Sequence, residues 1–586
     1  MAENRVLCNL YLLGFLLTKA FKKLSLFVRR NHMNTLLTNA NDSAQSDVAT
    51  NYEGGQTFNR SLREQVVQAL CVGRFGDTFY ASKLRLEEEA LEVLGKARVS
   101  DPEFLARAIV YGREKGFLKD SPITGLAILS GGGAKAKPLF EKIFNRVIQT
   151  PDDLRKFVTL CKSGTVPGVK TLGGYRRSAV KEWVSTLSGY HAVKYGSRAS
   201  KGFTLQDIVS LTHPETEDAA VAERLGWLKR GRKALGSNRK LNPQIRAAEA
   251  LKLVDDGQVA ISLIRSGKLP AEFVIPASTK MTTAIWRELL HNAPIFNLLR
   301  NLVTFTRHDV FKEDAEIAYA VERLTNVKAI EHSKILPFRF FDAWKKYVLV
   351  EGNDSRIADA LRTAANLSFV NMPTLGGRTV AIGSDVSGSM GCPVSPKGQT
   401  QFIDIAGIFT GAILRQIEGR AIPLPFQSRV IEGHGLSGHD DVLVTAEKVS
   451  RLLGGGTALG APIQHLLDRK IFADVFVGIT DNEDWAYGSG HHCHESFLEL
   501  WRKYRAKVNP KAQAFVIQIA PYKHAVAPTN EPGVHFIYGW SDTVVRYIPF
   551  ILEGGASQVQ EVEGMSLDNG GNQGRSGGHD HAQADA

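Results

Sequence analysis

Cysteine is scarce in this chain, with five residues among 586. They are Cys8, Cys71, Cys161, Cys392 and Cys493, an odd number at wide and irregular spacing. A disulfide framework needs an even set of cysteines at recurring spacings, so the pattern argues against a secreted, disulfide-stabilised fold. We therefore expect the protein to work in a reducing compartment, and we predict a cytoplasmic location.

Apolar runs long enough to cross a membrane are also lacking. The stretch VLCNLYLLGFLLTKAFKKLSLFVRR, at 6–30, has an apolar core too short to span a bilayer. Its positive charges mostly follow that core, and no small-residue cleavage site appears. We expect neither secretion nor a membrane partner, and we interpret residues 1–50 as a weakly ordered N-terminal extension.

Signatures of common catalytic sites are missing as well. There is no G-x-S-x-G motif around Ser387 and Ser389 and no GxxxxGK[ST] phosphate loop. The Gly-rich segment LSGGGAKAKP at 129–138 lies in a helical pattern and has no Ser or Thr after its lysines. The cluster HHCHE at 491–495 could bind zinc, but adjacent residues cannot all face one tetrahedral ion. We expect a protein that is not an enzyme, with no catalytic residues.

What the chain does contain is an ordinary globular composition with a basic excess. Hydrophobic residues make up 43% and charged residues 23%, and 72 Lys+Arg against 60 Asp+Glu give a net charge of +12. A chain of this length exceeds one hydrophobic core, so we expect at least two domains. The positive charge favours polyanionic partners without identifying one.

The hydrophobic pattern changes once along the chain. From about 58 to 367, apolar residues recur at three- and four-residue spacing, which predicts stacked helix pairs. After PTLGGRTV at 373–380, apolar strands alternate with helices, which predicts a parallel sheet covered on both faces. We predict a multidomain fold: the extension 1–50, an all-α helical-repeat domain at 51–370, a doubly wound α/β domain at 376–556 and a disordered tail at 557–586.

Oxygen-bearing side chains follow the strands of the predicted sheet. The run VAIGSDVSGSM places Asp385, Ser387 and Ser389 at spacing two directly after an apolar strand. By itself this could be an ordinary Asx/Ser turn. Thr457 in GGGTALG and Asp481 in GITDNED follow on two later loops, and loops at the carboxyl ends of parallel strands converge. Together the five residues form an oxygen-only set suited to Mg²⁺ or Mn²⁺.

This DxSxS motif, with its later Thr and Asp, resembles the metal-ion-dependent adhesion site (MIDAS) of von Willebrand factor A domains. The resemblance implies that Asp385, Ser387, Ser389, Thr457 and Asp481 are the metal-site residues. In such domains an acidic group of a partner completes the coordination. The resemblance therefore implies a docking site and not a catalytic one, with Mg²⁺ as the expected cation.

A second candidate site lies in the helical part, where Gly173–His213 mixes cations with aromatic residues. Cations neutralise phosphates and aromatic rings stack on unpaired bases, a combination typical of single-stranded RNA binding. Basic residues on solvated helix faces and aromatics inside helix pairs would explain the same composition. The residues that we propose to contact RNA are Arg176, Arg177, Lys194, Arg198, Lys201 and His213.

A helical array followed by an A-type domain resembles the Ro RNA-binding protein family, whose helical part is the TROVE module. The segments FNRSLREQVVQALCVGRFGDTFYAS, AVKYGSRASKGFTLQDIVSLTH, KILPFRFFDAWKKY, SDVSGSM, GGGTALG and TDNED match the family in order, from about Tyr52 to Glu553. The family implies a ring of HEAT-like repeats closed by the von Willebrand factor A-like domain. Carried over by position, Lys194, Arg198 and His213 are the best candidates for RNA contact.

The resemblance also implies the partners. Such rings bind single-stranded 3′ ends of misfolded non-coding RNAs in the central hole and small Y RNAs on the outer basic surface. The leading hypothesis is a monomeric scaffold for RNA quality control and decay, partnered with Y-like RNA and, as the resemblance implies, with an exoribonuclease. The alternative is a metal-dependent, adhesion-type protein-interaction scaffold that binds no RNA.

Overall fold

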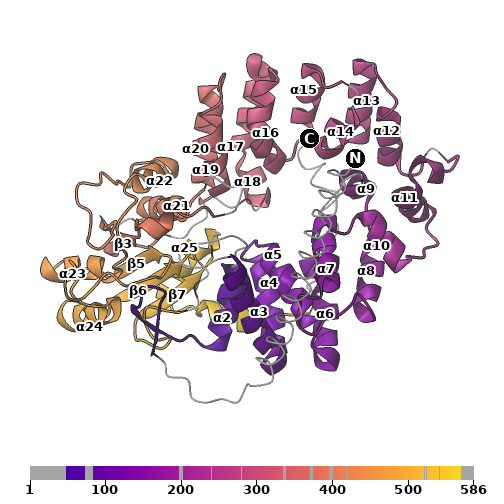
Figure 1. Cartoon of the computed structure of the whole chain (residues 1–586). Helices are drawn as coiled ribbons and strands as arrows, with labels where there is room; N and C mark the ends of the chain where they lie inside the picture. Colours follow the sequence, from indigo (N-terminus) through magenta and orange to yellow (C-terminus); the bar gives the residue numbers. More distant parts are fainter. Residues whose placement is uncertain are drawn as a thin grey trace, which may run out of the picture.

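The computed structural model describes residues 48–72, 83–196, 202–238, 240–278, 280–333, 335, 338–369, 374–394, 400–417, 419–520, 522, 524–539 and 542–568. It contains a helical part and an α/β domain, as the change in hydrophobic pattern predicts. The helices form a curved row whose two ends meet the α/β domain, so that the whole molecule is a ring (Figure 1).

The helical part begins with a short hairpin and then continues in helices, most of which pack against their neighbours along the chain. The hairpin pairs β1 (Val48–Thr50) with β2 (Gln56–Phe58). The helices are α2 (Leu62–Cys71), α3 (Lys83–Ser100), α4 (Pro102–Glu114), α5 (Asp120–Leu129), α6 (Gly133–Val147), α7 (Pro151–Ser163), α8 (Tyr175–Ser185), α9 (Gly189–Gly196), α10 (Leu205–Thr212), α11 (Ala219–Arg230), η1 (Gly231–Ala234), α12 (Pro243–Leu251), α13 (Gly257–Gly267), α14 (Ala271–Ala277), α15 (Thr283–His291), α16 (Ile295–Arg307), η2 (Val310–Lys312), α17 (Asp314–Thr325), α18 (Val327–Ser333), α19 (Phe338–Tyr347) and α20 (Ser355–Leu367).

Helix α7 shows why these segments are helical. Thr150 and Asp153 form a capping box, in which each side chain accepts a hydrogen bond from the other's backbone N–H, and proline occupies the first turn. The helix ends at Gly164, whose φ of 71° is left-handed and suits glycine. The buried residues recur on one face, at Leu154, Phe157, Val158 and Cys161. Each helix thus supplies one apolar stripe to a core that continues from helix to helix.

The α/β domain has a five-stranded, all-parallel sheet in the order β4-β3-β5-β6-β7. Alternate residues of β5 face opposite sides: Val477 packs in the core that contains α21 and α22, and Phe476 packs in the core with α23 and α24. Both faces are therefore covered, as the sequence predicts. The elements are β3 (Val380–Ser384), η3 (Gly388–Gly391), α21 (Phe402–Arg415), β4 (Ala421–Pro423), α22 (Val442–Ser450), α23 (Gly460–Asp468), β5 (Val475–Thr480), α24 (Phe497–Lys507), β6 (Gln513–Gln518), β7 (Val534–Tyr538), α25 (Asp542–Leu552) and α26 (Gln558–Gly564).

The first end of the helical row meets the sheet domain through the entry interface, residues 48–68 against 481–529. Phe58 and Ala525 exchange two backbone hydrogen bonds, at 2.8 and 3.0 Å. The buried Arg60 guanidinium donates to Gln518 Oε1 and to the Tyr522 carbonyl, and lies 5.2 Å from the centre of the Tyr538 ring. A buried cation needs such partners, so Arg60 ties the helical part to the sheet.

The other end of the row meets the domain through the exit interface, residues 345–366 against 404–442. Lys345 Nζ lies 3.1 Å from the fully buried Asp404 carboxylate at the start of α21. Arg362 of α20 donates to Asp441, which caps α22, at 2.8 Å. The two interfaces together close the ring (Figure 1).

The folded part of the chain extends past the predicted C-terminal end of the α/β domain. The expected disordered tail starts at 557, yet residues 558–564 form α26, which packs on α2 and α4. Arg107 Nη1 donates to the carbonyls of Glu563 and Met565 at the end of α26, at 2.7 and 2.6 Å. Val562 is fully buried. A single short helix carries too few apolar residues to be recognised from periodicity, and partners distant in sequence stabilise it. Likewise, residues 48–50 of the expected N-terminal extension belong to the hairpin.

Among the helices that the structure describes, none combines the length and the apolar character that a membrane crossing requires.

Candidate metal centre and basic surface

The five oxygen-bearing residues predicted to bind a cation lie at one edge of the sheet. Strands β3 and β5 are parallel neighbours, with Ser384 opposite Ile479, so Asp385 and Asp481 leave the sheet side by side. Between these strands the chain order reverses, because β3 is followed on one side by β4 and on the other by β5. Such a switch point is where open α/β sheets bind ligands.

Asp385 holds the first loop in place through both carboxylate oxygens. Its Oδ1 accepts from the Ser387 backbone N–H at 2.9 Å, and its Oδ2 accepts from the Thr480 hydroxyl at 2.6 Å. The hydroxyls of Ser387 and Ser389 lie 3.2 Å apart. The loop therefore turns all three side chains of the DxSxS motif toward the same point.

Glycines bring Thr457 to that point. Gly454 and Gly455 have φ values of 151° and 70°, which L-residues with side chains rarely adopt. The Gly455 carbonyl accepts from the Gly388 N–H at 3.0 Å, which joins the threonine loop to the DxSxS loop. The Thr457 carbonyl accepts from the N–H groups of Trp485 and Ala486 at 3.1 and 2.9 Å. The structure thus brings all five predicted residues together.

The electrostatics of this cluster are dominated by two buried carboxyl groups that repel each other. Asp385 and Asp481 are at most 1% exposed. Burial raises the pKa of both carboxyls, and with the added repulsion from Asp385 the pKa of Asp481 rises to about 7. Thr457 Oγ1 and Asp481 Oδ2 are buried and find no hydrogen-bond partner among the described residues. A hard divalent cation would satisfy both oxygens and neutralise the carboxylates, so the residues present fit Mg²⁺.

Two residues that support the cluster were not identified from the sequence. Thr480 donates to Asp385, and Asp484 accepts from the N–H groups of Leu459 at 2.8 Å and Phe497 at 3.4 Å. Asp484 therefore holds the loop after Thr457 against the loop after Asp481, and its burial raises its pKa to about 7. The motif GITDNED contains three acidic residues, and its letters do not reveal which one faces the cation and which one positions a loop.

The HHCHE segment does not assemble a metal site. Among the described residues, no three His, Cys, Asp or Glu side chains converge on one point. Cys493 is buried and donates its S–H to the Glu495 carbonyl at 3.3 Å, while His491, His492 and His494 are exposed. The segment is a surface loop around one inward-facing cysteine.

The basic residues predicted to contact RNA have different surroundings. The Arg177 guanidinium and the His213 ring are exposed and have no partner among the described residues. Arg176 donates to the carbonyls of Ser130 at 2.7 Å and Thr171 at 3.2 Å, so it also braces the loop before α8. Lys194 Nζ lies 3.5 Å from Glu272 and within 6 Å of the Tyr190 and Tyr195 rings. Arg198 and Lys201 lie outside the described residues.

Comparison with known proteins relates both parts of the chain to one family. The Ro60 vWA domain model matches residues 379–549, and the TROVE domain model matches residues 274–353. The chain is 25% identical over 457 residues to the RNA-binding protein RO60 of Deinococcus radiodurans, covering 74% of this chain and 83% of that protein. It is 24% identical over 480 residues to RNA-binding protein RO60 of Caenorhabditis elegans, covering 70% and 71%.

Both parts of the chain thus match domain models of the Ro family. The fold also resembles the crystal structure of the D. radiodurans Ro (RSR) protein, with a TM-score of 0.63 and 21% identity over 85% of this chain and all of that one. The helical-repeat part and the von Willebrand factor A-like domain predicted from the sequence are thus confirmed.

Proposed function

We propose that this protein binds RNA through its helical ring. The observation that carries the proposal is the combination of a closed helical ring with an exposed arginine, Arg177, that has no acidic partner among the described residues and lies beside the aromatic residues of α8 and α9. Arg177 and His213 are exposed, and no described acidic residue pairs with them. Phosphates would supply the charge that the protein leaves unmatched. The relatives in D. radiodurans and C. elegans are named RNA-binding proteins, which supports the same function.

The finer proposal is a scaffold for RNA quality control. A ring admits a single strand more easily than a duplex, so it selects RNAs with free single-stranded 3′ ends, such as misfolded non-coding RNAs. Y-like small RNAs would bind the outer basic surface, and an exoribonuclease would act on the RNA that the ring holds. Because the entry and exit interfaces close the ring within one chain, the protein needs no second copy to complete it, and we propose a monomer. We also propose a cytoplasmic location.

The steric part of this proposal can be tested with two RNAs that share one duplex. One carries a 3′ tail of about ten unpaired nucleotides and the other ends blunt. In filter-binding assays the tailed RNA is expected to bind at least ~10-fold more tightly, because about ten stackable bases are added. A control RNA with the same tail at the 5′ end tests the polarity of binding. Equal affinity for the tailed and blunt RNAs would contradict selection by single-stranded ends.

For the sheet domain we propose a Mg²⁺ site, with Mn²⁺ as a substitute. Asp385, Ser387, Ser389, Thr457 and Asp481 would hold the ion directly or through water. The cation would supply a positive charge to which an acidic group of a partner docks. The chain's own contribution is to fix five oxygens on three loops and to exclude other ligands by burial.

Mg²⁺ is expected to stabilise the α/β domain. Saturation at 100 times the dissociation constant adds about 2.7 kcal/mol, which raises the thermal transition by several degrees. Asp385→Ala is expected to remove this Mg²⁺-dependent rise while RNA affinity stays nearly unchanged. Differential scanning calorimetry with Mg²⁺ and with a chelator measures the effect.

The matched control is Asp468→Ala, which removes an exposed carboxylate at the end of α23. Removing a buried carboxylate can itself stabilise the metal-free domain, so the quantity compared is the difference between the Mg²⁺ and chelator scans. Identical scans of the parent protein with and without Mg²⁺ would contradict the site.

A further inference from the structure

The loop that follows β5 belongs both to the candidate metal centre and to the entry interface. Asp481 is the first residue of this loop, and the hairpin of β1 and β2 contacts its later residues. At the exit interface the chain itself connects the two parts of the molecule, because it runs there from α20 to β3. The ring is therefore closed by non-covalent contacts alone at the entry interface. Residues 481–487, which we call the shared loop, thus contribute to the metal centre and to the closure of the ring.

Asn51 connects the hairpin to the shared loop through a buried hydrogen bond. Its Nδ2 donates to the Asp484 carbonyl at 2.8 Å, and the side chain is 8% exposed. The Oδ1 of the same amide accepts from the N–H groups of Gly55 at 2.7 Å and Glu53 at 3.2 Å, which fixes the turn of the hairpin. A Cβ atom on Gly55 would lie 2.2 Å from the Asp484 carbonyl oxygen, so the turn packs directly on the backbone of the loop. Movement of the loop would leave buried polar groups without partners.

Two further hydrogen bonds hold the hairpin backbone on the shared loop. The Tyr52 N–H donates to Glu483 Oε2 at 3.1 Å, and the Gln56 N–H donates to the Tyr487 hydroxyl at 2.9 Å. Both donors belong to the hairpin and both acceptors belong to the loop, so the two bonds depend on the same placement of the loop. The hairpin thus docks along most of the length of residues 481–487.

The same loop is fixed on its other side to the residues of the metal centre. Asp481 Oδ1 accepts from the Glu483 N–H at 3.3 Å, so the backbone of Glu483 contacts the metal-site carboxylate while its side chain contacts the hairpin. The N–H groups of Trp485 and Ala486 donate to the Thr457 carbonyl. A cation held by Asp481 and Thr457 would therefore restrain both anchor points of the shared loop.

We propose that cation binding at Asp481 and docking of the hairpin stabilise each other, so that the metal centre controls how firmly the ring is closed. The inference rests on the proposed Mg²⁺ site. Each event orders the loop that the other event uses, and such coupling is reciprocal: the hairpin raises the Mg²⁺ affinity by the factor by which Mg²⁺ favours the docked hairpin. Helix α26 holds the α/β domain on α2 and α4 separately from the hairpin, so the affinity for tailed RNA need not change.

The first test is the Mg²⁺ affinity of Asn51→Ala, measured by isothermal titration calorimetry. The dissociation constant is expected to rise about 10-fold, because the hairpin no longer orders the loop. The matched control is Asn509→Ala, which removes a side chain that is 5% exposed and lies before β6, at the amino end of the sheet. Asn509 Nδ2 donates to the Ala473 carbonyl at 3.0 Å, and its Oδ1 accepts from the Lys511 N–H at 3.0 Å. The control is expected to bind Mg²⁺ as the parent does.

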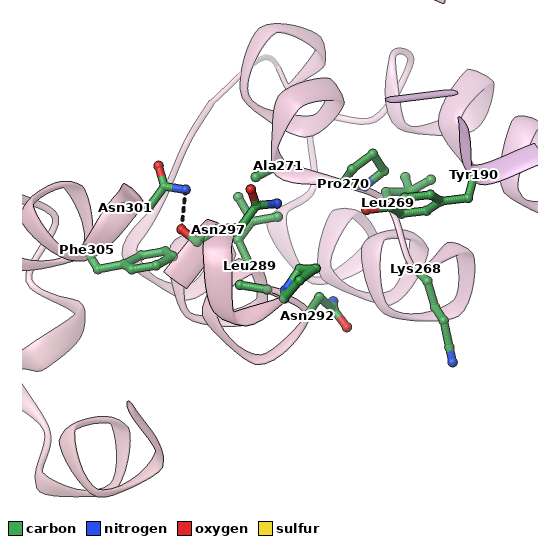
Figure 2. Close-up of a pocket in the computed structure, with 12 residues that line it drawn as sticks. Tyr190, Lys268, Leu269, Pro270, Ala271, Leu289, Asn292, Asn297, Asn301 and Phe305 are labelled. Atoms are coloured by element: carbon green, nitrogen blue, oxygen red, sulfur yellow. Dashed lines mark hydrogen bonds between the residues drawn. The ribbon is translucent and has the colours of Figure 1, made fainter. Parts of the chain in front are cut away.

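The second test needs no substitution. Amide hydrogen exchange of residues 51–58 in the parent protein is followed by mass spectrometry with Mg²⁺ and with a chelator. Exchange of the Tyr52 and Gln56 amides is expected to slow about 10-fold in Mg²⁺, by the same factor as in the calorimetry. Helix α16 is the internal reference, since it lies across the ring from α2 (Figure 1). Its own contacts, such as the bond from Asn301 to the Asn297 carbonyl (Figure 2), do not involve the hairpin, so its exchange should not change.

The outcomes separate this inference from the proposed metal site. A parent protein that binds no Mg²⁺ contradicts the metal site itself. A parent that binds Mg²⁺ overturns the coupling if Asn51→Ala binds the ion equally tightly, or if Asn509→Ala loses as much affinity as Asn51→Ala. Hairpin amides whose exchange is the same with and without Mg²⁺ also overturn it. If Asn51→Ala does not fold, the exchange measurement on the parent decides.

Discussion

Raising the salt concentration from about 50 to about 200 mM is expected to weaken RNA binding by about 100-fold. If each of the five lysines and arginines proposed to contact RNA neutralises one phosphate, the logarithm of the binding constant falls with the logarithm of salt at a slope of about −3.5 for a single strand. A fourfold rise in salt then reduces the affinity by about two powers of ten. Filter-binding titrations of a tailed RNA over this range measure the slope.

The substitution Arg177→Gln tests the contribution of one residue to this salt dependence. Its guanidinium has no protein partner among the described residues, so the substitution removes a phosphate contact without breaking an ion pair. The salt slope is expected to become shallower by about 1, with a loss of affinity that does not depend on RNA sequence. Arg451→Gln, an exposed arginine that directly follows α22 in the α/β domain, is the control. An RNA affinity that does not change with salt would contradict phosphate-dominated binding.

Arg113→Ala is expected to lower the free energy of unfolding by about 3–5 kcal/mol. Arg113 Nη2 lies 2.7 Å from Asp153 Oδ2, and the two side chains are 4% and 1% exposed. Removing the arginine leaves a buried carboxylate without its counter-charge, in a residue that also belongs to the capping box of α7. The thermal transition of the helical part is expected to fall by several degrees.

The double variant Arg113→Met, Asp153→Asn separates charge from packing. It removes both charges together, so no unpaired ion remains, and it is expected to recover most of the loss. The Asn side chain can still accept the Thr150 N–H that Asp153 accepts at 3.0 Å. A double variant no more stable than Arg113→Ala would show that the loss comes from the missing guanidinium packing and not from an unpaired charge.

The metal cluster was predictable because it follows from strand order. Asp385 and Asp481 come directly after apolar strands, and the carboxyl ends of parallel strands meet at one edge of a sheet. The glycines before Thr457 mark a loop that needs positive φ. The sequence does not reveal which residues hold the metal-site side chains in place. The hydrogen bond from Thr480 and the loop contacts of Asp484 depend on distances between segments that only the folded chain brings together.

The basic surface was less predictable for the same reason. Composition alone does not distinguish Arg177, which faces solvent, from Arg176, which donates to two backbone carbonyls. It also does not reveal that Lys194 pairs with Glu272, which lies far along the chain on α14. The closure of the ring by Arg60 and the packing of α26 are also long-range contacts. Periodicity identifies the helices, but their partners across the ring are set by tertiary packing.

Purification of the protein at low ionic strength, followed by crosslinking and sequencing of any attached RNA, tests the central claim most directly. The account predicts an ultraviolet spectrum with a nucleic-acid component that ribonuclease removes, and crosslinked peptides from α8–α10 in the helical part. A protein that is free of polynucleotide, and that does not bind added single-stranded RNA even at low salt, would contradict it.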